Sequence, residues 1–99
     1  YIMNIGICRI DLEFPDSHSL KDKRKALRSI VERVQSRFNV SIAEVDHHDN
    51  WRVATLGITC VSSDTRHANK IISKLVQYVE ECRWDAVMSD YHFEMLSGI

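Results

Sequence analysis

The sequence predicts one small α+β domain whose strands and helices follow the order β-α-β-β-α-β. At 99 residues the chain has the size of a single domain with one core. Its 44% hydrophobic and 27% charged residues are typical of a folded globular chain. Two stretches with the periodicity of amphipathic helices alternate with stretches that have the two-residue period of strands. We therefore expect residues 1–99 to form one domain.

The first half of the chain predicts a strand, a helix and a second strand. Residues 5–14 alternate apolar and polar side chains, which is typical of a half-buried strand. A capping residue, Ser19, and an apolar stripe that continues to Phe38 predict the helix. We expect Asn39 to adopt the left-handed conformation that ends many helices. Residues 40–46 then have the composition of a strand.

The second half repeats a strand, a helix and a strand. Residues 47–50 form a polar turn, and the strand predicted over 51–61 makes a hairpin with the preceding one. Residues 62–64 supply cap chemistry for a second helix, which is expected to end near Arg83. A last strand is expected over residues 84–96. This order is that of the ferredoxin-like split βαβ sandwich, with both helices on one face of a four-stranded antiparallel sheet.

The apolar positions of these elements predict a shared core and three buried thiols. The core positions lie on both helices and one strand: Leu27, Ile30, Val34, Leu56, Ile58, Ile71 and Leu75. The three cysteines are far apart and lie in apolar surroundings, so reduced thiols are expected rather than disulfides or metal ligands. They are Cys8, Cys60 and Cys82.

The net charge of −1 conceals a basic segment. Residues 21–37 carry seven Lys or Arg and two acids, so the remainder of the chain is acidic. Cations near a helix start oppose its partial positive charge, and an anionic partner would offset that cost. A solvated face kept for solubility is the alternative interpretation. Four cations share one arc opposite the apolar stripe and are the predicted nucleic-acid-binding residues: Lys21, Arg24, Lys25 and Arg28.

A cluster of acids and histidines occupies the predicted hairpin turn: Glu44, Asp46, His47, His48 and Asp49. Such side chains are ligands for divalent metals, and His67 or His92 could complete a site. Adjacent strand residues point to opposite faces, so His47 and His48 reach one ion only if the turn bends them together. A solvated surface turn is the alternative, and we expect neither a metal ion nor another cofactor.

One face of the sheet is expected to stay uncovered by helices. Its central strands offer no Phe or Tyr there, which disfavours the base-stacking mechanism of RNA-recognition motifs. Its apolar end, around Ile5 and Ile7, instead favours a homo-oligomer. Strand alternation assigns eleven residues to this open face: Ile5, Ile7, Arg9, Asp11, Glu13, Val53, Thr55, Thr59, Asp90, His92 and Glu94.

The sequence contains no motif that identifies an enzyme. It has no glycine-rich phosphate loop, G-x-S-x-G, H-E-x-x-H or C-x-x-C pattern. Catalysis by Cys8 with a histidine base would need a reactive thiol, and buried strand cysteines are inert. The apolar stretches fall short of the roughly 20 residues that span a bilayer, and we expect a cytoplasmic protein with no membrane partner.

Three stretches are similar to one family: ICRIDLEFP at 7–15, SLKDKRKALRSIVERVQSRFNVSIAEVDHHDNW at 19–51, and LGITCVSSD at 56–64. They resemble the bacterial YlxP-like family, a domain of unknown function. The resemblance implies a ferredoxin-like fold and a bacterial cytoplasmic protein whose genes often lie beside translation-initiation and ribosome-maturation factors. It implies no activity.

Three hypotheses of function follow from these features. The leading one is a non-enzymatic binding protein that contacts RNA or a ribosomal surface through the basic first helix. The second is a small metal-dependent enzyme centred on the acid and histidine turn. The third is a structural homo-oligomer joined through the open sheet face.

Overall fold

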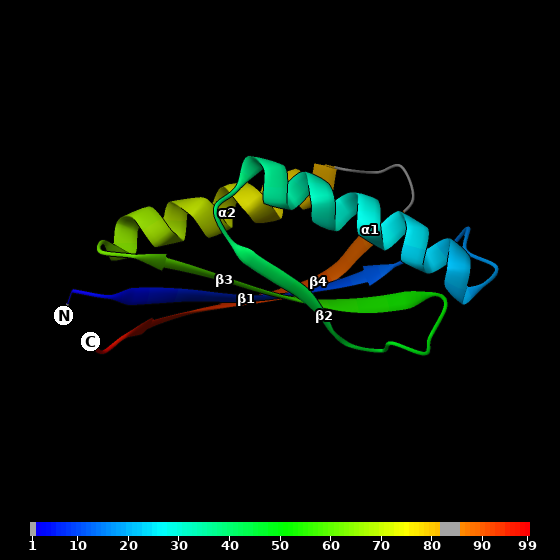
Figure 1. Cartoon of the computed structure of the whole chain (residues 1–99), viewed down its shortest axis with the longest axis horizontal. Coiled ribbons are helices and arrows are strands. Elements are labelled where there is room, and N and C mark those ends of the chain that lie inside the picture. The colour runs from blue at the N-terminus through cyan, green and yellow to red at the C-terminus, as the bar shows by residue number, and fades with distance from the viewer. Residues whose placement is uncertain (1, 82–85) are drawn as a thin grey trace.

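The computed structural model describes residues 2–81 and 86–99, and its element order confirms the predicted β-α-β-β-α-β arrangement (Figure 1). The predicted end of the second helix at Arg83 and start of the last strand at Trp84 lie outside the described residues. The elements are β1 (Asn4–Glu13), α1 (Leu20–Arg37), β2 (Ser41–Asp46), β3 (Val53–Ser62), α2 (Thr65–Glu81) and β4 (Val87–Ser97).

The four strands form one antiparallel sheet in the order β2-β3-β1-β4. Both helices cover the same face of this sheet, as Figure 1 shows, with α1 packed on β2 and α2 packed on β1, β3 and β4. The predicted ferredoxin-like α+β sandwich is therefore confirmed. Among the described residues, neither helix has the length and apolar character needed to cross a membrane.

Local hydrogen bonds define both ends of α1. The Ser19 hydroxyl accepts a hydrogen bond from the Asp22 N–H at 3.1 Å, which confirms the predicted cap. The prediction for Asn39 is wrong, because among the described non-glycine residues only His47 has a positive φ, of 62°. The helix instead ends at Phe38 in extended conformation, with its ring 5.9 Å from that of Tyr78. This contact directs the chain straight into β2, so no left-handed residue is needed.

The core lies between the helices and one sheet face, as predicted. Six of the seven predicted core residues are buried, while Ile71 is partly buried because its neighbour Ile72 takes the central position on α2. Gly6 of β1 lies directly beneath α2. A Cβ there would lie 3.0 Å from the Cys60 Sγ and 3.3 Å from the Ile72 Cγ1, so glycine permits the close packing of helix on strand.

The two described cysteines have unreactive thiols, as predicted. Cys8 and Cys60 are 1% and 3% exposed. Burial raises the pKa of the Cys8 thiol to about 11, although the neighbouring Arg9 charge opposes the shift. Burial also raises the pKa of Cys60, against a smaller opposing effect of a backbone hydrogen bond from Gly6. The prediction for Cys82 lies outside the described residues.

Candidate nucleic-acid interface

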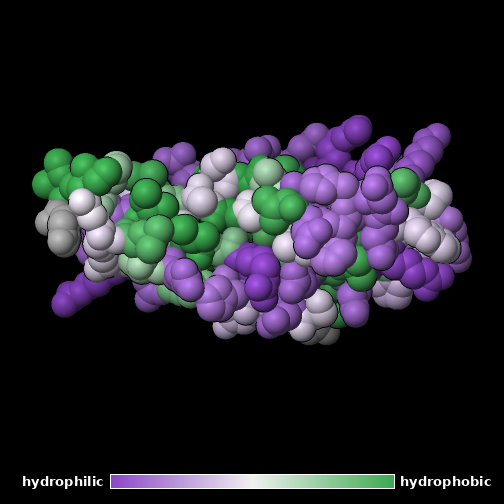
Figure 2. Space-filling model, turned by 90° about the horizontal axis from the view of Figure 1, so that it is seen from below, coloured by the Kyte–Doolittle hydropathy of each residue, from purple (hydrophilic) through white to green (hydrophobic). Residues whose placement is uncertain are grey.

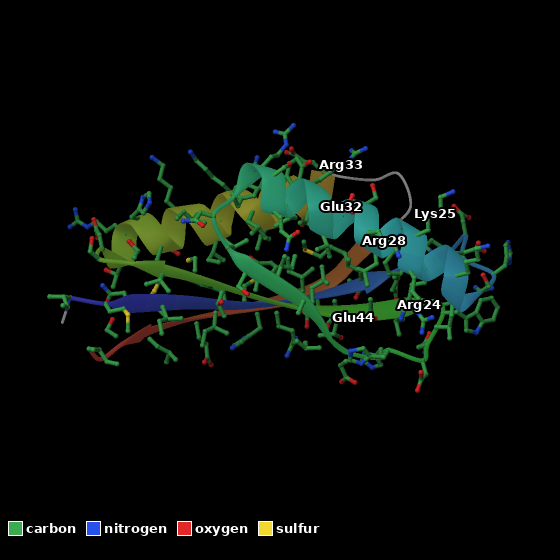
Figure 3. All side chains as sticks on the ribbon, in the orientation of Figure 1. Arg24, Lys25, Arg28, Glu32, Arg33 and Glu44 are labelled. Carbon is green, nitrogen blue, oxygen red and sulfur yellow. The ribbon has the colours of Figure 1, made fainter. Side chains whose placement is uncertain are left out.

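The four predicted binding residues all lie on the exposed surface of α1: Lys21, Arg24, Lys25 and Arg28. Their three- and four-residue spacing places them on neighbouring turns of the N-terminal half of the helix. Figure 3 shows Arg24, Lys25 and Arg28 projecting from this half. Within residues 2–81 and 86–99, none of the four forms an ion pair. Their positive charges are therefore available to an external anion.

Lys23, which lies within this basic segment, behaves in the opposite way and was missed by the sequence analysis. Its side chain is 0% exposed, and its ammonium donates three hydrogen bonds. The acceptors are the Glu44 Oε2 at 3.0 Å, the His47 carbonyl at 2.8 Å and the Val53 carbonyl at 3.1 Å. Figure 3 shows Glu44 on β2, beneath α1. All three protons of the ammonium are therefore satisfied, and Lys23 fixes α1 on the β2–β3 hairpin.

The signal that could have revealed Lys23 is its phase on the helix. It comes three residues after Leu20 and four before Leu27, so it falls within the apolar stripe that faces the sheet. A lysine in that stripe must find acceptors under the helix, since an unpaired buried charge is very costly. Its counterion, Glu44, belongs to the cluster that the sequence analysis considered as metal ligands.

The remaining charges of α1 do not cancel the basic row. Asp22 accepts a hydrogen bond from the His18 N–H at 3.1 Å and so belongs to the helix start. Glu32 is exposed on the following turn. Near the other end of the helix, the Arg37 guanidinium lies 4.7 Å from the centre of the Tyr78 ring. The uncompensated charge therefore concentrates on the N-terminal half of α1.

The structure directs the two turn histidines to different partners. The His47 Nδ1 lies 3.0 Å from the Thr55 Oγ1, and the His48 Nε2 lies 3.1 Å from the Glu44 carbonyl oxygen. His47 takes its left-handed conformation at the turn, where its own carbonyl accepts from Lys23. Glu44, His47 and His48 are thus engaged in holding the hairpin, and Asp46 accepts a hydrogen bond from the His47 N–H at 2.7 Å.

The two other histidines considered as ligands lie away from the hairpin turn. His67 is exposed in the first turns of α2. On β4, the His92 Nε2 lies 3.1 Å from the Glu94 Oε1. In the part of the chain that the structure describes, no group of three or more His, Cys, Asp or Glu side chains is arranged to hold a metal ion.

The polar end of the open sheet face is an ordered hydrogen-bonded network. Thr55 lies on this face, as predicted, yet is only 6% exposed. Its hydroxyl donates to the Asp11 Oδ1 at 3.0 Å, and the His47 ring lies at the same hydroxyl. The Arg9 guanidinium then lies 3.6 Å from the Asp11 carboxylate and 3.4 Å from that of Asp90. These contacts connect the hairpin turn to β1 and β4.

The other end of the open face is apolar. Ile5 lies opposite Val61 on β3 and Leu96 on β4. Val61 is 64% exposed, Leu96 49% and Ile7 36%. Figure 2 shows this division: hydrophobic residues gather at the end of the molecule where both termini lie, and hydrophilic residues cover the other end.

A surface pocket of about 460 Å³ adjoins the start of α1, with Phe14 and Ala26 among its lining residues. Lys25 is the one member of the basic row that lines it. Asp16 and Asp22 line the same pocket, so its acidic groups oppose the binding of a small anion. The basic row is therefore an open surface rather than an enclosed pocket. Its shape suits an extended anion better than a small one.

The fold and this surface define a ferredoxin-like α+β domain with one uncompensated basic helix face. Residues 5–93 match the family model described as a protein of unknown function, DUF503, and the chain belongs to this family. It is 36% identical to the uncharacterized protein YlxP of Bacillus subtilis (strain 168) over 76 residues, which are 77% of this chain and 83% of that protein. The predicted family resemblance is therefore confirmed.

The fold also occurs in a protein of unrelated sequence. The de novo designed protein Foldit4 superposes with a TM-score of 0.58 at 11% sequence identity, over 98% of this chain and 99% of the designed one. At that identity the similarity concerns the fold alone. The function must therefore be argued from the side chains of this chain.

Proposed function

We propose that the protein is a non-enzymatic binding module that contacts the phosphates of RNA through the basic row of α1. The supporting observation is that this row is exposed and unpaired within the described residues, while Lys23 beside it is buried against Glu44. The helix thus separates a charge that holds the fold from charges that face solvent. A ribosomal RNA surface has the dense phosphate array that such a row attracts.

The dimensions of the row fit several consecutive phosphates. Lys21 and Arg28 are seven residues apart, which is about 10 Å along a helix that rises 1.5 Å per residue. Four contacts within that length neutralise up to four phosphates. The bound anion also offsets the unfavourable interaction of these cations with the helix N-terminus.

The mode of recognition is positioning on the backbone rather than base reading. On the described β1 and β3 strands, the open face presents no Phe, Tyr or Trp on which bases could stack. Lysine and arginine on phosphates fix the orientation of a protein but carry little sequence information. We therefore expect weak sequence preference and strong dependence on salt.

The test compares wild type with a charge-reversed row in titrations against ribosomal RNA at low salt. Replacing all four residues of the row by Glu should abolish binding. A control with the same change in charge reverses four exposed cations elsewhere: Arg52, Arg66, Lys70 and Lys74. It should retain most of the affinity. For wild type, log affinity should fall with log salt at a slope of roughly −3 to −4 on duplex and less on single strands.

The proposal is wrong if wild type and the reversed row bind equally, or if wild type does not bind. Equal loss in the reversed row and in its control would also contradict it. That outcome would show that net charge, rather than this helix face, determines binding.

A further inference from the structure

We propose that two copies of the chain pair through the outer edge of β4, so that their sheets join into one of eight strands. In the described residues β4 pairs with β1 alone, so its other edge has no strand partner. The Tyr91 N–H is bonded to the Asp90 Oδ1 at 2.8 Å, a local contact that a second strand would replace. Its register with β1 is regular from Asp90 to Ser97, with the irregularity confined to the Asp11/Leu12 position. This inference is independent of the proposed RNA binding.

The opposite edge of the sheet is protected in a way that β4 is not. β2 has six residues, and its register with β3 shifts between Glu44 and Asp46. A short edge strand is a common defence against pairing with another chain. β4 also carries carboxylates and one irregularity, but that irregularity precedes Asp90 and leaves the rest of the strand regular. β4 has eleven residues and contains no proline or lysine. The β4 edge is therefore the better template for a second strand.

One register makes the β4 edge complementary to itself. A two-fold axis normal to the sheet keeps each face on its own side, so opposite residues share a face. With Phe93 opposite Phe93 of the second copy, His92 faces Glu94 of that copy. Tyr91 then faces Met95, and Asp90 faces Leu96. A histidine–carboxylate hydrogen bond, an aromatic pair and an aromatic–thioether pair are all favourable across strands.

The neighbouring registers lack this complementarity. Centring the pair on His92 places Asp90 against Glu94, and centring it on Glu94 places that carboxylate against itself; like charges directly opposite are destabilising. Centring on Tyr91 places Asp90 against His92, but it sets Phe93 opposite the small Ser89, next to the irregular Asp11/Leu12 position, and leaves Met95 and Leu96 without an opposite residue in the regular part of β4. The seven residues from 90 to 96 therefore select the Phe93 register.

The same contact would cover an apolar groove beside the edge. A groove of about 180 Å³ lies between α2 and β4, lined by Ile72, Ser73, Val76, Tyr91 and Phe93. Tyr91 is 51% exposed although its face is the helix-covered one. In the Phe93 register, Tyr91, Phe93 and Met95 of the second copy lie along this groove. One contact thus satisfies the main-chain edge and removes apolar surface from water.

The apolar end of the open sheet face, where the sequence predicted self-association, is a weaker alternative. Ile7, Val61 and Leu96 are exposed there, but no charged pair fixes how a second copy would sit. At the β4 edge, main-chain pairing and the hydrogen bond of His92 to Glu94 of the second copy specify both the axis and the register. The outcomes of the test distinguish these two surfaces.

Register-specific cross-linking tests the proposal, with Cys82→Ser as the background for every variant. His92 and Glu94 have side chains that are 59% and 61% exposed, so replacing either by Cys should leave the fold intact. Opposite residues have Cβ atoms about 4.5–5.5 Å apart, within about 1 Å of the separation in a disulfide, so a small shift lets the bond form; diagonal neighbours are about 7–8 Å apart and suit it poorly. A mixture of His92→Cys and Glu94→Cys should therefore cross-link several-fold more than either variant alone.

Sedimentation of the wild type completes the experiment. Reversible dimers at micromolar concentration, together with cross-links specific to the mixture, would support the proposal. If either single variant cross-links as much as the mixture does, the two strands pair in another register and the proposal is overturned. Monomers without cross-links would overturn it as well. Dimers without cross-links would assign self-association to another surface, and replacement of Val61 by Glu would then show whether the open face is responsible.

Discussion

Replacing Lys23 by Met removes the buried charge at the centre of the α1–hairpin contact while largely keeping its volume. The Val53 carbonyl loses its donor in a place where the lysine is 0% exposed, and an orphaned buried acceptor costs about 1–3 kcal/mol. The His47 carbonyl loses one of two donors and keeps the Asn50 N–H at 3.1 Å, so its loss is about 1 kcal/mol. Glu44 loses its counterion, but its side chain is 19% exposed and can regain water, so its contribution is smaller.

The sum predicts that Lys23→Met lowers the free energy of unfolding by about 2–4 kcal/mol. This is a large part of the about 5–15 kcal/mol that stabilises a typical domain. The matched control is Lys25→Met, which makes the same change on the exposed side of α1 and should stay within about 0.5 kcal/mol of wild type. Urea unfolding, followed by circular dichroism and by tryptophan fluorescence, measures both values.

A double-mutant cycle separates the ion pair from the carbonyl bonds. Glu44→Gln keeps an oxygen acceptor for Lys23 and should cost about 1–2 kcal/mol. Combining it with Lys23→Met should cost less than the sum of the two single changes, because the charges interact directly at 3.0 Å. If Lys23→Met unfolds within about 1 kcal/mol of Lys25→Met, then Lys23 does not fix the helix as described.

Three further outcomes are expected. Leu56→Ala should cost about 2–5 kcal/mol in urea unfolding because Leu56 is 0% exposed, whereas Thr59→Ala on the open face should be nearly neutral; similar losses would reject the face assignment. Burial raises the pKa of Cys8 from about 9 to about 11, so the stability it contributes is complete below pH 9 and is lost as pH rises to 11. Between pH 9 and 11 the free energy of unfolding should therefore fall less steeply for Cys8→Ala than for wild type. Equal slopes of the two curves would contradict the raised pKa. Chelator treatment should leave the thermal midpoint unchanged; a drop restored by one added metal would show that the hairpin turn binds it.

The spacing of apolar residues predicted most of the fold because one face of each helix or strand is buried along its length. The strand alternation of β1 and the stripe of α1 each involve several residues, so one polar exception does not hide the pattern. Asn39 illustrates the limit of local signals. Its type favours a left-handed helix end, but the packing of Phe38 on Tyr78 decides the path of the chain, and Tyr78 is far away in the sequence.

Some residues of the candidate site were predicted correctly and others were missed, because local patterns are visible in the sequence and contacts between distant residues are not. Exposure of the basic row follows from helical phase alone. Lys23 required knowledge that Glu44, His47 and Val53 converge under the helix, which depends on the pairing of β2 with β3. Thr55 was correctly placed on the open face, yet the left-handed His47 folds its ring over it, and no sequence rule gives that turn geometry.

The burial of Lys23 has a consequence for how this surface can change. Lys23 points under the helix while Lys21, Arg24, Lys25 and Arg28 point to solvent, so α1 carries one fixed internal charge and a row of external ones. In the proposed binding mode, substitutions at Lys21, Arg24, Lys25 or Arg28 would tune the affinity for a polyanion stepwise, since each alters one contact. A change at Lys23 would instead weaken the attachment of the helix that carries all four. The affinity of the proposed surface could therefore vary while the attachment of its helix is kept.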